Sequence, residues 1–127
     1  MIRLPWLSAY LRVLERRDGF TAVWERFFDD WDVFVCPLDP ITAPRHTEED
    51  APLMVESTLV SPEQRKAPFA ISPMMGGPAI TIPLGQDRNG LPIGVLLVGR
   101  RWEDERLLAI AERLAEVAGG YRRPPGF

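Results

Sequence analysis

Apolar residues at helical spacing near the start of the sequence predict two amphipathic helices. The first is expected over about residues 6–17, because apolar side chains recur at i, i+3, i+4 and i+7 between Leu7 and Leu14. Gly19 can end this helix in a left-handed conformation, and a second helix is expected over about 21–31. The second helix carries large aromatic side chains on one face, which indicates a face buried in a core: Phe20, Trp24, Phe27, Phe28 and Trp31.

Three short apolar runs predict β-strands over 32–36, 79–84 and 93–98. The third run has no polar alternation, so both of its faces should be covered. Between the first two strands, residues 37–73 contain seven prolines. This composition predicts a long irregular crossing with one helical turn near residues 61–64, where a proline follows a serine cap.

A last helix is expected over 103–118, since acidic residues open it and two glycines follow it. Its predicted inner face is Leu107, Ile110, Ala111, Leu114 and Ala118. The predicted fold class is therefore α/β, with a small mixed sheet of about three strands and about three helices. Such a sheet has two unpaired edges and few helices to cover it, which indicates further structure in a missing part of the chain or in a partner.

Composition narrows the classes of partner. The 127 residues suit one domain, and a formal charge of −3 argues against nucleic acid or an anionic membrane as the main partner. No apolar run approaches the ~20 residues that span a bilayer, and no signal-peptide pattern opens the sequence. The single cysteine, Cys36, cannot form an intramolecular disulfide. We therefore expect a cytoplasmic chain.

Four segments follow one another in a distinctive order. An aromatic helix leads into a strand ending in a Pro turn (27–37), a small-residue loop enters a strand (74–85), a Gly-Leu-Pro turn opens a strand (90–99), and an acidic cluster opens a helix (103–108). In this order they resemble the C-terminal third of amidase signature proteins, a family of amide-bond hydrolases. The sequence departs from the family at Pro73, where Asn is common, and at Leu96, where Gln is common.

The resemblance implies amide hydrolysis by a serine nucleophile, with a second serine that relays the proton and a lysine base. Those groups lie upstream of this segment in the family. Here Ser8, Ser57, Ser61 and Ser72 have no serine neighbour, and Lys66 lies in a polar run typical of a solvated surface. We therefore assign no catalytic residue to this chain, and we expect no cofactor and no metal.

Four other groups of residues each allow a functional and a purely structural interpretation. Cys36, His46 and Asp50 could form a Cys–His–Asp site, but a cysteine ending an apolar strand is typical of a buried hydrophobe. The acidic run 48–50 lacks the partners of a metal shell, and 85–90 lacks the Lys-Ser/Thr of a phosphate loop. Arg100 and Arg101 could hold an anion, although a solvated pair is the favoured interpretation.

The sequence as a whole favours a C-terminal segment of an amidase that completes the sheet and one wall of the pocket for a small amide substrate. Met74, Met75, Gly76 and Gly77 are the candidate wall, because glycine permits close backbone approach and methionine offers an adaptable apolar surface. The crossing after Pro37 is a second candidate. The predicted partner is the missing N-terminal amidase region or a partner chain. The rival hypotheses are a noncatalytic stand-alone interaction module and an enzyme that uses Cys36.

Overall fold

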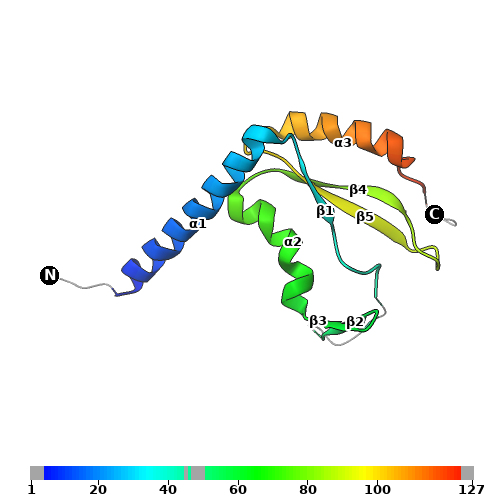
Figure 1. Cartoon of the computed structure of the whole chain (residues 1–127), viewed down its shortest axis with the longest axis horizontal. Coiled ribbons are helices and arrows are strands. Elements are labelled where there is room, and N and C mark those ends of the chain that lie inside the picture. Colours follow the sequence, from blue (N-terminus) through cyan, green and yellow to red (C-terminus); the bar gives the residue numbers. More distant parts are fainter. Residues whose placement is uncertain (1–4, 45, 47–50, 124–127) are drawn as a thin grey trace.

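The computed structural model describes residues 5–44, 46 and 51–123. These residues form α1 (Pro5–Asp30), β1 (Phe34–Pro37), β2 (Leu53–Val55), β3 (Thr58–Val60), α2 (Pro62–Met75), β4 (Ala79–Gln86), β5 (Pro92–Val98) and α3 (Asp104–Ala118). β1, β5 and β4 pair in that order to form a sheet, with α3 along one face and α1 and α2 on the other (Figure 1). The α/β class is confirmed.

β5 is the central strand and is antiparallel to both of its neighbours. Phe34 of β1 and Ala79 of β4 both lie opposite Val98. Every strand pair in the described residues is antiparallel, whereas the sequence predicted a mixed sheet. Leu97 and Val98 are fully buried, which confirms that β5 is covered on both faces.

Two hydrophobic clusters lie on opposite sides of the sheet. On one side, Leu96 and Val98 pack with Phe28 of α1 and Met75 of α2. On the other side, Leu97 and Ile82 pack with Leu107 and Ala111 of α3. Two of the five residues predicted for the inner face of α3 are thus buried, while Leu114 is 38% exposed because α3 covers only part of the sheet.

The predicted break at Gly19 is wrong, since α1 is one helix of 26 residues. Within this helix, the hydroxyl of Thr21 donates to the carbonyl of Arg17 one turn earlier at 3.0 Å. A glycine inside a helix costs only about 0.5–1 kcal/mol, which the burial of the aromatic side chains that follow readily offsets. Trp31 lies beyond the helix and is 63% exposed, stacked on Phe27.

The crossing is also more regular than predicted. The single turn expected near 61–64 is the start of α2, where Ser61 and Gln64 bond reciprocally in a capping box and Pro62 occupies the first turn. The helix continues through Pro68 and Pro73 to Met75 because Ile71 and Met75 pack against the core. Upstream, β2 and β3 form a hairpin around Glu56, which has a positive φ of 54°.

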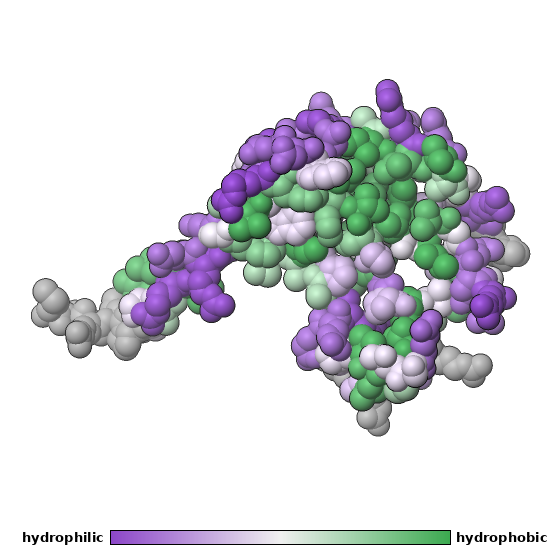
Figure 2. Space-filling model, viewed as in Figure 1, coloured by the Kyte–Doolittle hydropathy of each residue, from purple (hydrophilic) through white to green (hydrophobic). Residues whose placement is uncertain are grey.

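The first half of α1 extends away from the sheet, whereas its second half lies against the body of the molecule (Figure 1). Along the extended half, Leu7 is 39% exposed and Tyr10 and Leu11 are more than half exposed. A second hydrophobic area lies over the strands, below the hydrophilic outer side of α3 (Figure 2). Large apolar surfaces on a soluble domain usually mark sites of contact with other protein segments.

Candidate functional site

The loop of residues 38–44, which follows β1, is fastened to α2 by an ion pair. Asp39 accepts hydrogen bonds from Arg65 at 2.7 Å (Nη2 to Oδ2) and 3.3 Å (Nε to Oδ1). Asp39 Oδ1 also accepts from the backbone N–H of Ile41 at 3.2 Å. The hydrogen bonds that Arg65 donates to Asp39 raise the pKa of Arg65 above its ordinary value. The two-point pair therefore sets the spacing between the 38–44 loop and α2.

The other end of the 38–44 loop is tied to the turn between β4 and β5. The hydroxyl of Thr42 donates to Asp87 Oδ2 at 3.0 Å, while Asp87 Oδ1 accepts from the N–H groups of Leu91 and Asn89. The hydrogen bond from Leu91, aided by those from Thr42 and Asn89, lowers the pKa of Asp87. Because the folded pKa is lowered, this stabilisation is present at neutral pH and is lost as the pH falls below about 4.

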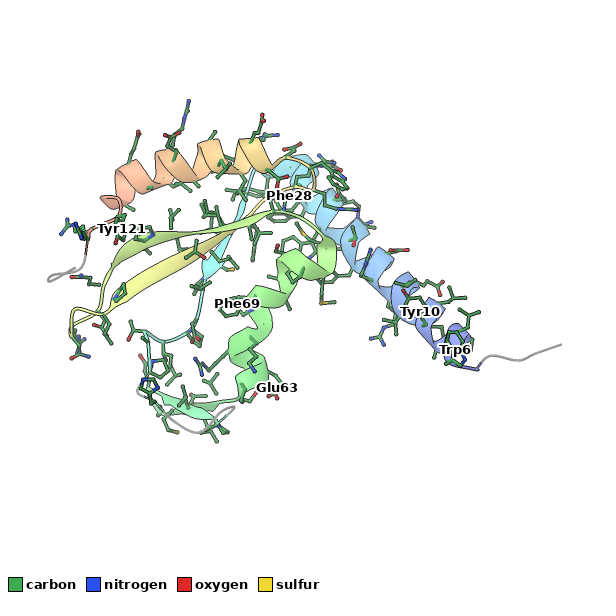
Figure 3. The ribbon with its side chains drawn as sticks, turned by 180° about the vertical axis from the view of Figure 1, so that it is seen from behind. Trp6, Tyr10, Phe28, Glu63, Phe69 and Tyr121 are labelled. Atoms are coloured by element: carbon green, nitrogen blue, oxygen red, sulfur yellow. The ribbon has the colours of Figure 1, made fainter. Side chains whose placement is uncertain are left out.

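A pocket of about 360 Å³ opens between the 38–44 loop, α2 and the start of β5. We call it the Gly94 pocket, because Gly94 forms part of its floor beside Pro92 and Ile93. A Cβ at Gly94 would meet Thr81 Cγ2 at 2.9 Å and Leu38 Cδ2 at 3.7 Å. Phe69 closes the α2 side and extends from that helix towards β1 (Figure 3). The lining is mostly apolar, and its two polar side chains, Asp39 and Thr42, are already hydrogen-bonded.

The predicted wall residues are divided between different surroundings. Met74 and Met75 belong to the last turn of α2, not to a loop, and the side chain of Met75 is 2% exposed within the core. Gly76 ends the helix with φ 73°, and a Cβ on Gly77 would lie 2.8 Å from the carbonyl oxygen of Gly99. Pro37 lies on a separate groove of about 310 Å³ with Pro40 and Pro68.

Of the imagined Cys–His–Asp group, the two residues that the structure describes, Cys36 and His46, have different surroundings. Cys36 is half-buried on β1 opposite Leu96, and burial raises the pKa of its thiol, which opposes formation of a thiolate. His46 is exposed, and Asp50 lies outside the described residues. The acidic run 48–50 also lies outside them, and elsewhere in the described chain no group of three or more His, Cys, Asp or Glu side chains could hold a metal ion.

The interpretation of Arg100 and Arg101 as a solvated pair is wrong. Arg100 donates to Glu25 at 3.1 Å and to Asp29 at 3.0 Å, and so joins the segment before α3 to the end of α1. Arg101 is half-buried, and its guanidinium lies 5.7 Å from the ring centre of Trp102. Sequence reasoning missed these roles because the partners of Arg100 are more than 70 residues away.

A comparison of the sequence with models of known protein families shows which family the chain belongs to. Residues 7–108 match the Amidase family model. The chain belongs to the amidase family. None of the described helices is long and apolar enough to cross a bilayer.

Relatives of this amidase chain are much longer than it is. It is 36% identical over 98 residues to a fatty acid amide hydrolase of Oryza sativa, a match that covers 77% of this chain and 16% of the relative. It is 31% identical over 121 residues to the protein AmiD of Mycobacterium tuberculosis, covering 91% and 24%. The chain thus spans about a sixth to a quarter of the length of these relatives.

Solved structures give the same picture of a part within a larger amidase fold. One crystal structure of an amidase superimposes with a TM-score of 0.74 at 22% identity, over 85% of this chain and 24% of the other. An inhibitor-bound chain from a vestigial complex related to an s-triazine catabolic enzyme gives a TM-score of 0.72 at 26% identity, over 96% and 26%.

Two serines of the described amidase chain serve the ends of α2. The Ser61 side chain caps the first turn. The Ser72 hydroxyl donates to the carbonyl of Gly77 at 2.7 Å, and the Ser72 carbonyl accepts from the N–H groups of Gly76 and Gly77. Lys66 is exposed on the same helix. These hydrogen bonds give each of the two serines a local structural role at one end of α2.

Proposed function

We propose that this chain is the C-terminal segment of an amidase signature hydrolase and that it completes the sheet and one side of the substrate pocket. In this proposal the serine nucleophile and lysine base belong to the remainder of the amidase. The chain alone would then not hydrolyse amides. The observation that carries the proposal is the family match over residues 7–108 by a chain that spans only about a sixth to a quarter of its relatives.

Uncovered surfaces support the same proposal. In the described residues β4 pairs only with β5, so the backbone groups along its outer edge have no strand beside them. The apolar row on the first half of α1 is exposed as well. Unpaired edges and apolar rows are costly features, which an adjoining part of the same fold would cover.

For the pocket wall, the structure supports the crossing after Pro37 in preference to the end of α2. The 38–44 loop is held at Asp39 and at Thr42, and it borders the Gly94 pocket. The backbone at Gly76 and Gly77 stays a predicted wall, with Met74 beside it as the exposed side chain. Met75 would contribute by packing, because its side chain is buried.

Complementation tests the proposal. The rice fatty acid amide hydrolase would be expressed without the segment aligned to this chain, and this chain would be supplied either fused in its place or as a separate polypeptide. We expect hydrolysis of a fatty acid amide only when both parts are present, with the hydrolase's own segment as the positive control. Hydrolysis by the purified 127-residue chain alone would overturn the proposal. A folded chain that restores no activity would favour the stand-alone module.

A further inference from the structure

We infer that the Gly94 pocket binds an uncharged, apolar substituent of the amide substrate, and that the Asp39–Arg65 pair is the positioning device that holds this pocket open. The inference rests on the proposed function only in taking the ligand to be the amide substrate. Its supporting observations are the volume of the hollow, the chemistry of its lining and the fastening of its walls.

The hollow lies where the 38–44 loop and α2 meet the start of β5. α2 packs Ile71 and Met75 onto the far end of the sheet, around Leu96 and Val98. Two residues before Leu96 on β5, Gly94 lines the hollow beneath the 38–44 loop, and the place that its Cβ would take is crowded by Thr81 and Leu38. The hollow's volume of about 360 Å³ lies within the range of about 300–1,000 Å³ usual for small-molecule sites.

The lining favours a neutral ligand. Leu38, Ile41, Phe69 and Ile93 supply apolar surface. The carboxylate of Asp39 is engaged by Arg65 through both oxygens, and the hydroxyl of Thr42 donates to Asp87. A charged group entering the pocket would lose its hydration and find these polar partners already occupied, which is costly. An apolar group would instead gain from burial.

The walls come from separate elements but are fixed before any ligand binds. The 38–44 loop reaches α2 through Asp39 and reaches the β4–β5 turn through Thr42. Because the walls are preorganised, less conformational entropy of the loop and side chains is lost on binding. Asp39 is therefore a positioning residue, which acts through the loop and not by contact with the reacting atoms.

The test is a titration of the full chain with two amides of equal length, hexanamide and the cationic 6-aminohexanamide, followed by amide ¹H–¹⁵N NMR. We expect hexanamide to shift the signals of Thr42, Ile93 and Gly94 and to bind about tenfold more tightly than the charged amide. Equal or tighter binding of the charged amide, or shifts confined to other surfaces, would overturn the inference.

Variants locate the site. Phe69→Ala, which removes a 45% exposed side chain from the wall, and Gly94→Ala, whose Cβ would push against Thr81 and Leu38, should each weaken hexanamide binding about fivefold or more. Leu84→Ala is the control, because Leu84 is 54% exposed and lines a different groove near the end of α3. Unchanged binding by the folded Phe69 and Gly94 variants would contradict the assignment.

The positioning role has its own readout. Asp39→Asn should weaken hexanamide binding, and the double exchange Asp39→Arg with Arg65→Asp should restore it by rebuilding the pair in reverse. Failure of the single substitution to weaken binding would refute the role of the pair. Because binding is measured without catalysis, a chain that binds hexanamide but restores no hydrolase activity would count against the proposed function alone.

Discussion

The two halves of α1 have similar sequence patterns but different surroundings. In the second half, Trp24 lies 4.9 Å from Phe34 and 5.5 Å from Phe27 between ring centres, and Phe28 is 7% exposed. In the first half, Tyr10 and Leu11 are 57% and 54% exposed. Tyr10 lies on the part of α1 that extends away from the strands (Figure 3). Both rows repeat every three to four residues, as an amphipathic helix requires.

The difference shows what periodicity specifies. An apolar row predicts that one face of a helix will be buried, but it does not say whether the covering surface belongs to the same chain. The aromatic row on the second half of α1 packs against β1, β5 and α2. In our proposal, the first half finds its cover in the remainder of the amidase.

The largest expected effect comes from removing an aromatic side chain in the covered half. Phe28→Ala should lower the free energy of unfolding by about 3–5 kcal/mol, because it leaves a cavity beside Leu96 and Val98. Chemical denaturation measures the loss. Tyr10→Ala, the matched change in the uncovered half, should cost less than about 0.5 kcal/mol. Equal losses at the two positions would refute the comparison.

An intermediate effect is expected at Gly19, where the two halves meet. Gly19 lies within α1, and a Cβ there would meet no atom within 4 Å. Gly19→Ala should therefore raise the free energy of unfolding by about 0.5–1 kcal/mol. Gly119→Ala is the control, since Gly119 has φ 91° and alanine there should cost about 1 kcal/mol. Destabilisation by Gly19→Ala would indicate a break between two helices.

The smallest effect on stability is expected for a charge placed on the uncovered row. Leu11→Glu should change the free energy of unfolding of the chain by less than about 0.5 kcal/mol. It should nevertheless abolish complementation of the truncated hydrolase, because association would bury an unpaired carboxylate. Val13→Glu makes the same change outside the row, at a residue that is 62% exposed, and should complement normally. Loss of complementation in both variants would argue against a specific contact.

Local patterns in the sequence predicted the elements whose signals are local. The apolar runs predicted β1, β4 and β5, and the acidic start with two closing glycines predicted α3. The hairpin of β2 and β3 was missed, although two β-prone triplets flank the two residues 56–57. The prolines concealed α2, since their penalty is offset by packing of Ile71 and Met75 that only the tertiary structure reveals.

The candidate site was less predictable than the fold. Asp39 pairs with Arg65 across 26 residues, and Thr42 bonds Asp87 across 45 residues. No spacing rule in a single sequence connects such residues. The sequence did mark the crossing after Pro37 as a candidate, but the Gly94 pocket is formed by the 38–44 loop, α2 and the start of β5, which only the tertiary structure brings together.

The most direct measurement is hydrogen–deuterium exchange of the chain with and without the truncated rice hydrolase. The account predicts that binding slows exchange in α1 between Leu7 and Leu14, whereas the amides near Phe28 change little because they are already covered. Unchanged exchange along the whole of α1 in the presence of the hydrolase would contradict the claim that this chain is one part of a larger amidase.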